Sequence, residues 1–509
     1  MRIRYFLLVL IIVINGCSSN EEQFPPIEED YCSQLTPVHF DGLSDQLANL
    51  PDSLLSKTGV HLLEEGDVSM VFRAWLCESA QKTIDVQYFI FSSDNVGLIA
   101  VDYLLRAADR GVKVRLIVDD FMVEADADAL LALDSHPNMS IKIYNPTTNV
   151  GKNLPRKLQS LAGDFKGFNQ RMHNKTFIVD GRAAITGGRN VADEYYDYDH
   201  EYNFRDRDVL LLGKAVRDIR ESFSVFWESD LSVPIANLVT ADSAEINAAA
   251  KFEYLHQYAC NPQNFWPEVR EKIAATPQRF QELLESGEFA WVEKLSFVSD
   301  LPGKNETDDL KGGSPTTDWL IQLVSQAQSS INIQSPYLVT TELGQRLFKG
   351  AIERGVEIKI LTNSLAGTDN LTAFSGYARE REKLLDIGVD IYEFRPDAAV
   401  RFERMTGALQ KRLNFKPIFA LHAKSMVVDE RISVVGTFNL DPRSANLNTE
   451  CICIIHDASL SRKLVRVMTE EMGPRNSWHI TKNFNPDREA GLWKRADAWF
   501  RGIVPKSIL

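Results

Sequence analysis

The chain has 509 residues, of which 44% are hydrophobic and 25% are charged, so it is long enough for two or three globular domains with ordinary cores. Its formal net charge is −14, which argues against a broad nucleic-acid-binding surface, because such surfaces carry a basic balance. Nucleic acid is therefore not an expected partner.

The first residues have the pattern of an export signal. Arg2 and Arg4 precede an apolar run from Tyr5 to Ile14, which is shorter than the roughly 20 residues that a membrane-spanning helix needs. The run leads into Ile-Asn-Gly-Cys17, which resembles the lipobox of bacterial lipoproteins. We therefore expect 1–17 to be a signal peptide and Cys17 the lipidated residue. An ordinary signal peptide, with Cys17 incidental, is the alternative.

The segment after Cys17 is acidic. Five carboxylates and a Pro-Pro pair lie between Ser18 and Asp30, a composition typical of a solvated linker. We expect an acidic tether over 18–50. Because Ser18 rather than Asp follows Cys17, the outer membrane is favoured, with the protein on the periplasmic side.

The other cysteines have two expected environments. Cys77, Cys451 and Cys453 lie in apolar stretches and are expected in the core. Cys32 and Cys260 could pair in an oxidising compartment, but the sequence leaves their state open. No Cys-x-x-Cys motif or histidine cluster indicates a metal site.

A long internal repeat organises the chain. AQKTIDVQ at 80–87 parallels AQSSINIQ at 327–334, and RGVKV at 110–114 parallels RGVEI at 354–358. A repeat this long indicates a duplicated domain rather than a solenoid. We predict similar domains at 51–245 and 296–509, joined by a helical connector at 246–295.

Each half alternates apolar strand patterns with amphipathic helix patterns. This alternation predicts α/β/α sandwich domains with mixed, largely parallel sheets, because a helix that connects two strands brings the chain back in the same direction. The predicted strands lie at 83–91, 112–118 and 140–144 in the first half and at 330–334, 356–362 and 389–394 in the second, with helices at 97–110 and 343–354.

Each half also contains one copy of a His-x-Lys-x4-Asp motif. Histidine and lysine are two residues apart on a strand, so their side chains face the same side. A lone copy would be weak evidence, but two copies, each followed by Gly-x-x-Asn inside a duplicated domain, indicate a catalytic role. The motif residues are His173, Lys175 and Asp180 in the first half and His422, Lys424 and Asp429 in the second.

These residue types suit phosphoryl transfer. One histidine can attack phosphorus while the other protonates the leaving oxygen. The lysines, the amides of Asn190 and Asn439 and the hydroxyl of Thr437 can offset charge on the phosphate oxygens, although the first half has Gly188 where the second has Thr437. Asp180 and Asp429 precede turns, so we expect them mainly to accept hydrogen bonds from backbone amides.

A neutral histidine needs an acidic partner that holds one ring nitrogen. Glu450, which precedes an apolar strand, is the candidate in the second half. In the first half Asp208 takes the matching place before a strand. Glu201 is the rival, because it follows His173 by 28 residues, as Glu450 follows His422.

Over roughly residues 50 to 500 these features resemble the phospholipase D superfamily, whose signature is the duplicated motif. The string RMHNKTFIVDG at 171–181 and DVQY at 85–88 look most like the bacterial cardiolipin synthase C-type branch. The resemblance implies two domains related by a pseudo-twofold axis, one active site between them, a covalent phosphohistidine, and no metal or organic cofactor. It further implies His173 as the nucleophile and His422 as the general acid.

Basic and apolar residues alternate before both motifs, which suits contact with anionic lipid headgroups, although ordinary solvated loops would look the same. We expect membrane phospholipids as substrates, with phosphatidylglycerol first and phosphatidylethanolamine second, peripheral membrane contact, and function as a monomer. The expected activity is phosphatidyl transfer that makes cardiolipin; a hydrolytic phospholipase D, a nuclease and a non-enzymatic scaffold are the alternatives. The basic residues are Lys152, Arg156, Lys157, Lys166 and Arg171, then Arg401, Arg404, Lys411, Arg412 and Lys416.

Overall fold

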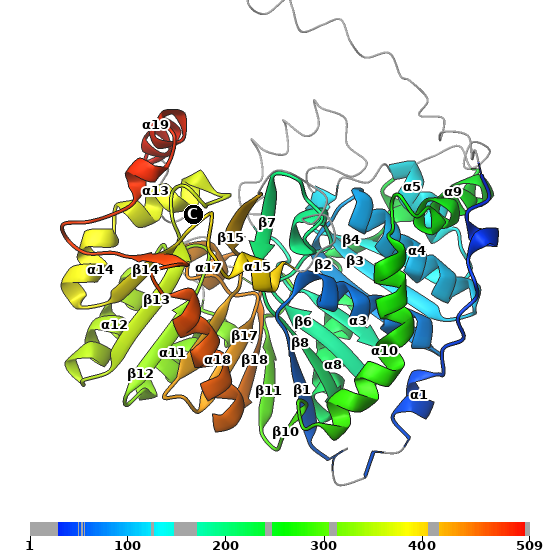
Figure 1. The fold of residues 1–509 in the computed structure, drawn as a ribbon, viewed down its shortest axis with the longest axis horizontal. Helices are drawn as coiled ribbons and strands as arrows, with labels where there is room; N and C mark the ends of the chain where they lie inside the picture. The colour runs from blue at the N-terminus through cyan, green and yellow to red at the C-terminus, as the bar shows by residue number, and fades with distance from the viewer. Residues whose placement is uncertain are drawn as a thin grey trace, which may run out of the picture.

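Two mixed β-sheets stand side by side in the computed structural model, each with helices packed on it, and β1, β10 and β11 meet between them (Figure 1). The predicted fold class of two α/β domains is confirmed. The structure describes residues 29–48, 50, 51, 54, 56–123, 127–146, 170–239, 247–304, 313–405 and 417–503. Cys17 and the basic residues Lys152, Arg156, Lys157, Lys166, Lys411, Arg412 and Lys416 lie outside these ranges.

The first sheet carries the first motif. Its strands, in spatial order, are β10 (Ala290–Val292), β1 (Thr58–Leu63), β8 (Asp208–Gly213), β6 (Ala183–Gly187), β5 (Thr176–Val179), β2 (Thr83–Phe91), β3 (Lys113–Val123), β4 (Met139–Tyr144) and β9 (Ser232–Pro234). Its helices are α1 (Leu43–Gln46), α3 (Gly66–Ser79), α4 (Asn95–Asp109), α5 (Ala127–Asp134), α8 (Lys214–Glu228), α9 (Ala248–Cys260) and α10 (Pro267–Glu285).

The second sheet repeats this arrangement. Its strands, in spatial order, are β11 (Leu295–Ser299), β18 (Cys451–His456), β17 (Ile432–Gly436), β16 (Ser425–Val428), β12 (Ser330–Gln334), β13 (Glu357–Asn363), β14 (Asp390–Phe394) and β19 (Ser477–His479). Its helices are α11 (Pro315–Gln326), α12 (Glu342–Glu353), α13 (Leu371–Ala378), α14 (Arg381–Ile387), α15 (Arg401–Arg404), α17 (Pro442–Asn446), α18 (Ala458–Glu471) and α19 (Leu492–Arg501). Short 3-10 helices lie at Cys32–Gln34, Asp193–Tyr195, Ile235–Asn237 and Asp487–Glu489.

The sheets are mixed, as predicted, but the expectation that they are largely parallel is wrong. Parallel pairing joins β2, β3 and β4 in the first sheet and β12, β13 and β14 in the second. The other neighbouring pairs among the described strands of both sheets are antiparallel. The motif regions explain the difference: β5 and β6, like β16 and β17, are joined by links of a few residues, and so short a link forces a hairpin.

The helical segment expected as a connector belongs to the first domain. α9 packs against α4 and α10 packs against α3. β10, which follows them, pairs with β1 of the first sheet, whereas β11 pairs with β18 of the second. The chain therefore passes from one domain to the other between Val292 and Leu295.

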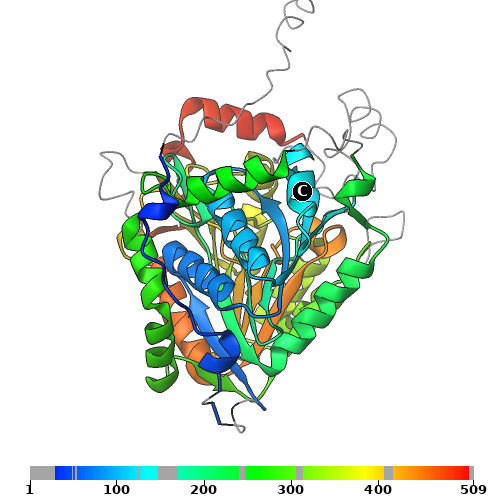
Figure 2. The same ribbon diagram turned by 90° about the vertical axis from the view of Figure 1, so that its right-hand side faces the viewer.

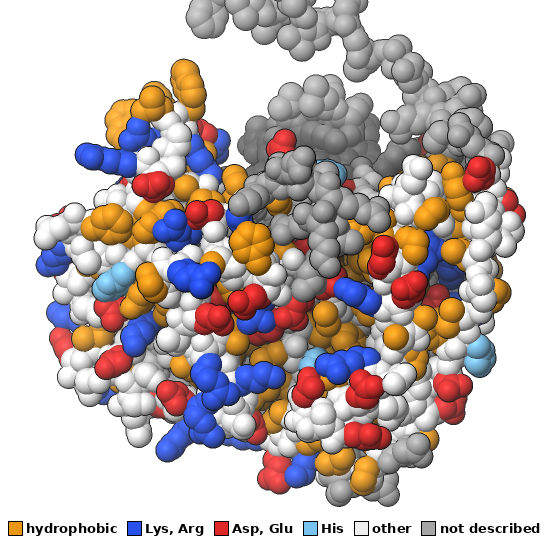
Figure 3. Space-filling model, viewed as in Figure 1, with side chains coloured by type: hydrophobic (Ala, Val, Ile, Leu, Met, Phe, Trp, Pro, Cys, Tyr) orange, Lys and Arg blue, Asp and Glu red, His pale blue; other side chains and the backbone are white. Residues whose placement is uncertain are grey.

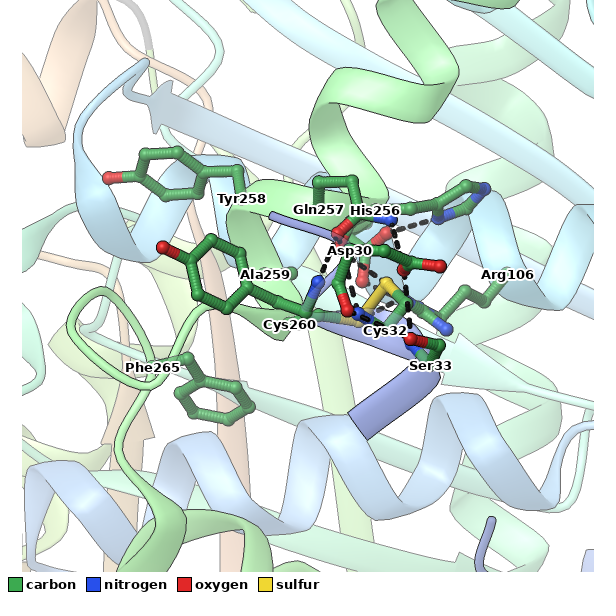
Figure 4. The surroundings of a disulfide bond; sticks show 12 residues. Asp30, Cys32, Ser33, Arg106, His256, Gln257, Tyr258, Ala259, Cys260 and Phe265 are labelled. Atoms are coloured by element: carbon green, nitrogen blue, oxygen red, sulfur yellow. Dashed lines mark hydrogen bonds and ion pairs between the residues drawn. A yellow bond between two sulfur atoms is a disulfide. The ribbon is translucent and has the colours of Figure 1, made fainter. Parts of the chain in front are cut away.

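The N-terminal segment is fixed to α9 by a disulfide between Cys32 and Cys260 (Figure 4). Beside it, the Gln257 side chain accepts a hydrogen bond from the Tyr31 amide at 2.8 Å and donates one to Asp30 at 2.9 Å. The segment expected as a tether is therefore held against the first domain from Asp30 onward. The remaining described cysteines, Cys77, Cys451 and Cys453, are buried thiols, as predicted.

A shared core joins the two domains. It combines residues of β6, β8 and α8 from the first domain with residues of β16, β17, β18 and α18 from the second. A two-stranded parallel sheet of β7 (Tyr202–Arg205) and β15 (Ile418–Leu421) also bridges the domains. In the part of the chain that the structure describes, no helix is long and apolar enough to cross a bilayer.

Candidate active site

Backbone pairing between the domains places the two motif histidines. The amide of His422, which follows β15, donates to the carbonyl of Arg205 at the end of β7, at 2.8 Å. In the other half the amide of His173 donates to the carbonyl of Thr449 at 3.0 Å. Arg205 and Thr449 each precede a carboxylate residue in the sequence. Each histidine therefore lies beside a carboxylate of the opposite domain.

Each imidazole is held by that carboxylate. His173 Nδ1 lies 2.8 Å from Glu450 Oε2, and His422 Nδ1 lies 2.5 Å from Asp206 Oδ2. Both carboxylate residues are fully buried. Because a carboxylate engages Nδ1 of each ring, chemistry falls to Nε2, which in His422 also lies 3.0 Å from Lys424 Nζ. Glu450 was predicted for this role.

Asp206, rather than Asp208 or Glu201, is the partner of His422, so both of those predictions are wrong. Asp208 instead binds Arg73 Nη2 at 2.9 Å and Ser69 Oγ at 2.8 Å. Glu201 is exposed.

Sheet register explains the correction. Asp208 lies opposite the motif glycine Gly187, just as Ile452 lies opposite Gly436 in the other half. Asp208 is therefore the counterpart of Ile452, and the residue two positions earlier, Asp206, is the counterpart of Glu450. Asp206 follows His173 by 33 residues, whereas Glu450 follows His422 by 28. A spacing of 28 in the first half therefore points to Glu201, which is the wrong residue.

The two motif lysines are buried beside the histidines. Lys175 Nζ donates to the carbonyl of His173 at 2.9 Å, and Lys424 Nζ lies 2.8 Å from His422 Nδ1 and 3.0 Å from its Nε2. Burial and the charge of Lys424 lower the pKa of Lys175 to about 7, and burial lowers the pKa of Lys424 to about 8. An anion bound between these ammonium groups would favour their charged forms.

Burial and nearby lysines lower the pKa of both histidines. Burial, Lys175 and Lys424 hold the pKa of His173 well below its usual value. Burial and Lys424 lower the pKa of His422 to about 4, against the opposing effect of Asp206. Both rings are therefore neutral near pH 7 in this site, and a neutral ring is what a nucleophile requires.

The two carboxylates differ. Burial opposes ionisation of Asp206, but His422 and Lys424 outweigh it and hold the pKa of Asp206 below its usual range. Burial raises the pKa of Glu450 to about 7 despite Lys175. The ionised Asp206 raises the pKa of His422 and so partly offsets the lowering by burial and Lys424, which is the direction that a general acid requires.

Thr437 supports Glu450, and the prediction that its hydroxyl contacts phosphate is wrong. Its Oγ1 donates to Glu450 Oε2 at 2.5 Å and accepts from the Cys451 amide at 2.9 Å. Gly188, its counterpart in the first half, lies beside Asp206. A Cβ at position 188 would lie 2.0 Å from Asp206 Oδ1, so glycine leaves room for the carboxylate that holds His422.

The two asparagines have different surroundings. Asn190 Nδ2 donates to the Tyr195 hydroxyl at 2.8 Å, and the Tyr195 ring packs edge-on against His422 with 5.1 Å between centroids. The buried Asn439 Oδ1 has no hydrogen-bond partner among the described residues. Phosphate binding by Asn190 and Asn439 stays a prediction.

Asp180 and Asp429 accept hydrogen bonds from backbone amides, as their place before turns predicted. Their assignment as catalytic residues is wrong. Asp180 accepts from the amides of 81, 82 and 83, and Asp429 accepts from those of 328, 329 and 330, at 2.7–3.1 Å. Both lie at the ends of β5 and β16 that are remote from the histidines. They therefore anchor the starts of β2 and β12.

A buried polar network across the interface was not predicted. Arg207 Nε donates to Glu64 Oε1 at 2.8 Å, and Arg207 Nη1 donates to Ser425 Oγ at 2.8 Å in the second domain. Arg205 Nε donates to Glu471 Oε1 at 2.5 Å, also in the second domain. Removing one member of such a buried network typically lowers the free energy of unfolding by roughly 3–5 kcal/mol. The network therefore holds the two half-sites together.

The described basic residues near the motifs do not form the expected lipid-contacting surface. Arg171 is buried and paired with Asp119 at 3.3 Å. Arg401 is also buried, and Arg404 binds Glu65 of the first domain at 2.9 Å. The prediction is therefore wrong for these three residues, because Arg171 and Arg401 are buried and Arg404 forms an ion pair across the domain interface.

Both motif regions match one family model, described as cardiolipin synthase, PLD-like domain, over residues 76–227 and 320–472. The chain is 34% identical to cardiolipin synthase C of Escherichia coli strain K12, covering 87% of this chain and 88% of that protein. It is 24% identical to a cardiolipin synthase of Clostridium perfringens strain SM101, over 78% of this chain and 67% of that protein.

A solved structure shares the fold. The phosphatidylserine synthase of Haemophilus influenzae Rd KW20 matches with a TM-score of 0.58 and 15% identity, over 90% of this chain and 98% of that one. The family match falls on both motif-bearing domains, and the sequence match to cardiolipin synthase C spans nearly the whole of both proteins. The chain therefore belongs to the cardiolipin synthase family of phospholipase D-like phosphatidyltransferases.

Proposed function

We propose that this protein makes cardiolipin by moving the phosphatidyl group of phosphatidylglycerol to a second lipid alcohol, through a covalent phosphohistidine. The observation that carries the proposal is the crossed pair of contacts, His173 with Glu450 and His422 with Asp206, in one buried site beside two lysines. Two histidines, one beside an ionised Asp206 and one beside Glu450 with its raised pKa, suit a two-step transfer that needs a nucleophile and an acid. The similarity to cardiolipin synthase C supports the choice of lipid.

In the first step, Nε2 of His173 attacks the phosphorus of phosphatidylglycerol. The bond between phosphorus and the headgroup oxygen breaks, and His422 gives that oxygen a proton, so free glycerol leaves. Glu450 holds Nδ1–H of His173 and stabilises the ring as it becomes bonded to phosphorus. Lys175 and Lys424 offset the charge on the phosphate oxygens.

In the second step, a hydroxyl group of another lipid gives its proton to His422 and attacks the same phosphorus. The bond between phosphorus and His173 breaks, and the histidine becomes neutral again. With phosphatidylglycerol as the acceptor the product is cardiolipin, whereas with water it is phosphatidic acid. Transfer therefore requires that a lipid hydroxyl reach the intermediate ahead of water.

We further propose that the protein works as a monomer on the periplasmic side of a bacterial outer membrane, tethered through lipidated Cys17. One chain carries both half-sites. The disulfide between Cys32 and Cys260 is compatible with an oxidising compartment.

Product analysis tests the proposed activity. Purified protein is incubated with phosphatidylglycerol, alone and with phosphatidylethanolamine, and the products are identified by mass spectrometry, with His173→Ala as the inactive control. Cardiolipin with an equal amount of glycerol is expected. Phosphatidic acid without cardiolipin would refute the transferase and support the hydrolase.

A further inference from the structure

The C-terminal helix α19 presents an apolar side to solvent. Ala498, on the opposite side, is buried against the second domain. Figure 3 shows hydrophobic side chains gathered at the projecting end of α19, with Lys and Arg side chains beside them. The large apolar residues are Leu492, Trp493, Trp499, Phe500 and, just beyond the helix, Ile503, with exposed fractions of 74%, 90%, 75%, 61% and 83%.

The composition of α19 matches that of helices that lie in a lipid–water interface. Tryptophan favours that interface, because its ring is apolar and its N–H is polar. Lys494, Arg495 and Arg501 outnumber the single acidic residue Asp497, although the whole chain carries a net charge of −14. Basic residues beside an apolar face favour anionic phospholipid. Ten residues are too few to span a bilayer, so the helix would lie in the surface.

α19 is attached to a loop that borders the active site. Lys494 Nζ donates to the carbonyls of Ala366 and Thr368, at 3.0 and 2.9 Å. Between these residues, Gly367 accepts a hydrogen bond from Tyr202 of β7, the strand that leads into Asp206.

The neighbouring Asp369 accepts a hydrogen bond from Tyr337 at 2.8 Å, and its charge acts on both His422 and Lys424. The position of α19 is thus tied through one loop to the catalytic residues of the second domain.

The described N-terminus lies at the same end of the molecule as α19, at the top of both Figure 1 and Figure 2. Cys32 is held there by its disulfide to α9. A chain anchored at Cys17 would reach the first domain from this end. A single anchor point leaves the body of a protein free to rotate, whereas a second contact at α19 would restrict its orientation.

We propose that α19 is an interfacial membrane-binding helix that docks this end of the protein on an anionic phospholipid surface and presents the active site to it. The proposal rests on the proposed function for the identity of the surface, since the substrates of that reaction are the lipids of the bilayer. The aromatic side chains of α19 enter the headgroup region, and the exposed Arg501 contacts the phosphates.

Vesicle binding tests the helix. Trp493→Glu/Trp499→Glu is compared with the matched Val225→Glu/Leu343→Glu, which alters exposed apolar residues of α8 and α12. Both are made in the full chain with Cys17→Ser, so that a lipid on Cys17 contributes to neither. On vesicles of phosphatidylethanolamine and phosphatidylglycerol, the tryptophan variant should bind about tenfold more weakly or worse, and the control should bind like the parent. Equal binding by the two variants, each with an unchanged melting temperature, overturns the proposal.

Activity separates this proposal from the proposed function. The tryptophan variant should lose turnover on vesicles but keep turnover of dibutyroyl phosphatidylglycerol, which dissolves as monomers. Vesicle binding that depends on α19, in a protein that turns over no lipid, would support the helix proposal and refute the proposed activity. Concentration-dependent self-association of the parent that the tryptophan variant loses, with vesicle binding unchanged, would identify a second copy as the occupant and overturn the membrane proposal.

Discussion

Asp206 of the first domain holds the ring of His422 of the second, with 2.5 Å between Asp206 Oδ2 and His422 Nδ1. Glu450 makes the reciprocal contact with His173. Each domain therefore supplies a histidine and a lysine to one half of the site and a carboxylate to the other half. Neither domain alone contains a histidine with its orienting partner.

Asp206→Asn should mainly lower kcat, whereas the neighbouring Asp208→Asn should mainly lower the free energy of unfolding. Asp206→Asn removes the charge that favours protonated His422, so kcat should fall about 10²-fold or more while KM changes little. Asp208→Asn leaves Arg73 without its charged partner and should lower the free energy of unfolding by about 3–5 kcal/mol. Steady-state kinetics and urea unfolding measure the two effects. Equal losses of kcat in both variants would contradict the assignment of Asp206.

A substrate with a good leaving group should reveal which histidine attacks. A p-nitrophenyl ester of phosphatidic acid needs no proton on its leaving oxygen, because nitrophenolate is a stable anion. His422→Ala should therefore release a burst of nitrophenolate and accumulate a phosphatidyl adduct on His173, detectable by intact-protein mass spectrometry. His173→Ala should show neither. An adduct on His422 in the His173→Ala protein would reverse the roles.

Anion binding should weaken as pH rises. The pKa of Lys175 is lowered to about 7 and that of Lys424 to about 8, so both lose charge between about pH 6 and pH 9. In that range the unfolded chain binds more protons at these lysines than the folded protein does, so they make the empty protein more stable as pH rises. Tungstate should therefore raise the melting temperature more at about pH 6 than at about pH 9.

Lys175→Met should reduce this pH dependence, whereas Lys349→Met, at an exposed lysine of α12, should leave it unchanged. Thermal unfolding with and without tungstate measures both. A tungstate effect that is independent of pH in the unaltered protein would contradict the role of the lysines in binding the phosphate.

Removal of the disulfide should destabilise the first domain without changing its chemistry. The bond links residues that are 228 apart in sequence. Removing a native disulfide typically lowers the free energy of unfolding by about 2–5 kcal/mol. Cys32→Ser/Cys260→Ser should lower the melting temperature, and a reducing agent should produce the same shift in the unaltered protein but no further shift in the variant. Turnover measured below the melting transition should be unchanged; a loss of kcat there would show that the N-terminal segment also acts on the site.

Cys17→Ser should change how the exported protein is held by membranes. The lipidated protein should require detergent for release, whereas the variant should be extracted by alkaline carbonate, because only peripheral contacts would remain. Fractionation of washed membranes followed by immunoblotting measures this. A variant that still requires detergent would show that Cys17 is not the anchor.

Local patterns were sufficient to predict much of the fold and half of the site. Strands 83–91 and 330–334 match β2 and β12 at both ends, because buried strands between helices have strong apolar patterns. The amide-bonding role of Asp180 and Asp429 followed from their place before turns. Glu450 was also predicted correctly.

What the sequence by itself determined is the duplicated motif, the α/β domains that carry it and the residue types of the reaction. Only the tertiary structure decided that the carboxylates cross between domains, that Asp206 takes the place predicted for Asp208, that Cys32 pairs with Cys260, and that α19 is left exposed. Spacing along one chain carries no information about a partner on another domain. Register between β6 and β8 and docking of the two half-sites set those contacts, and both depend on packing across the whole molecule.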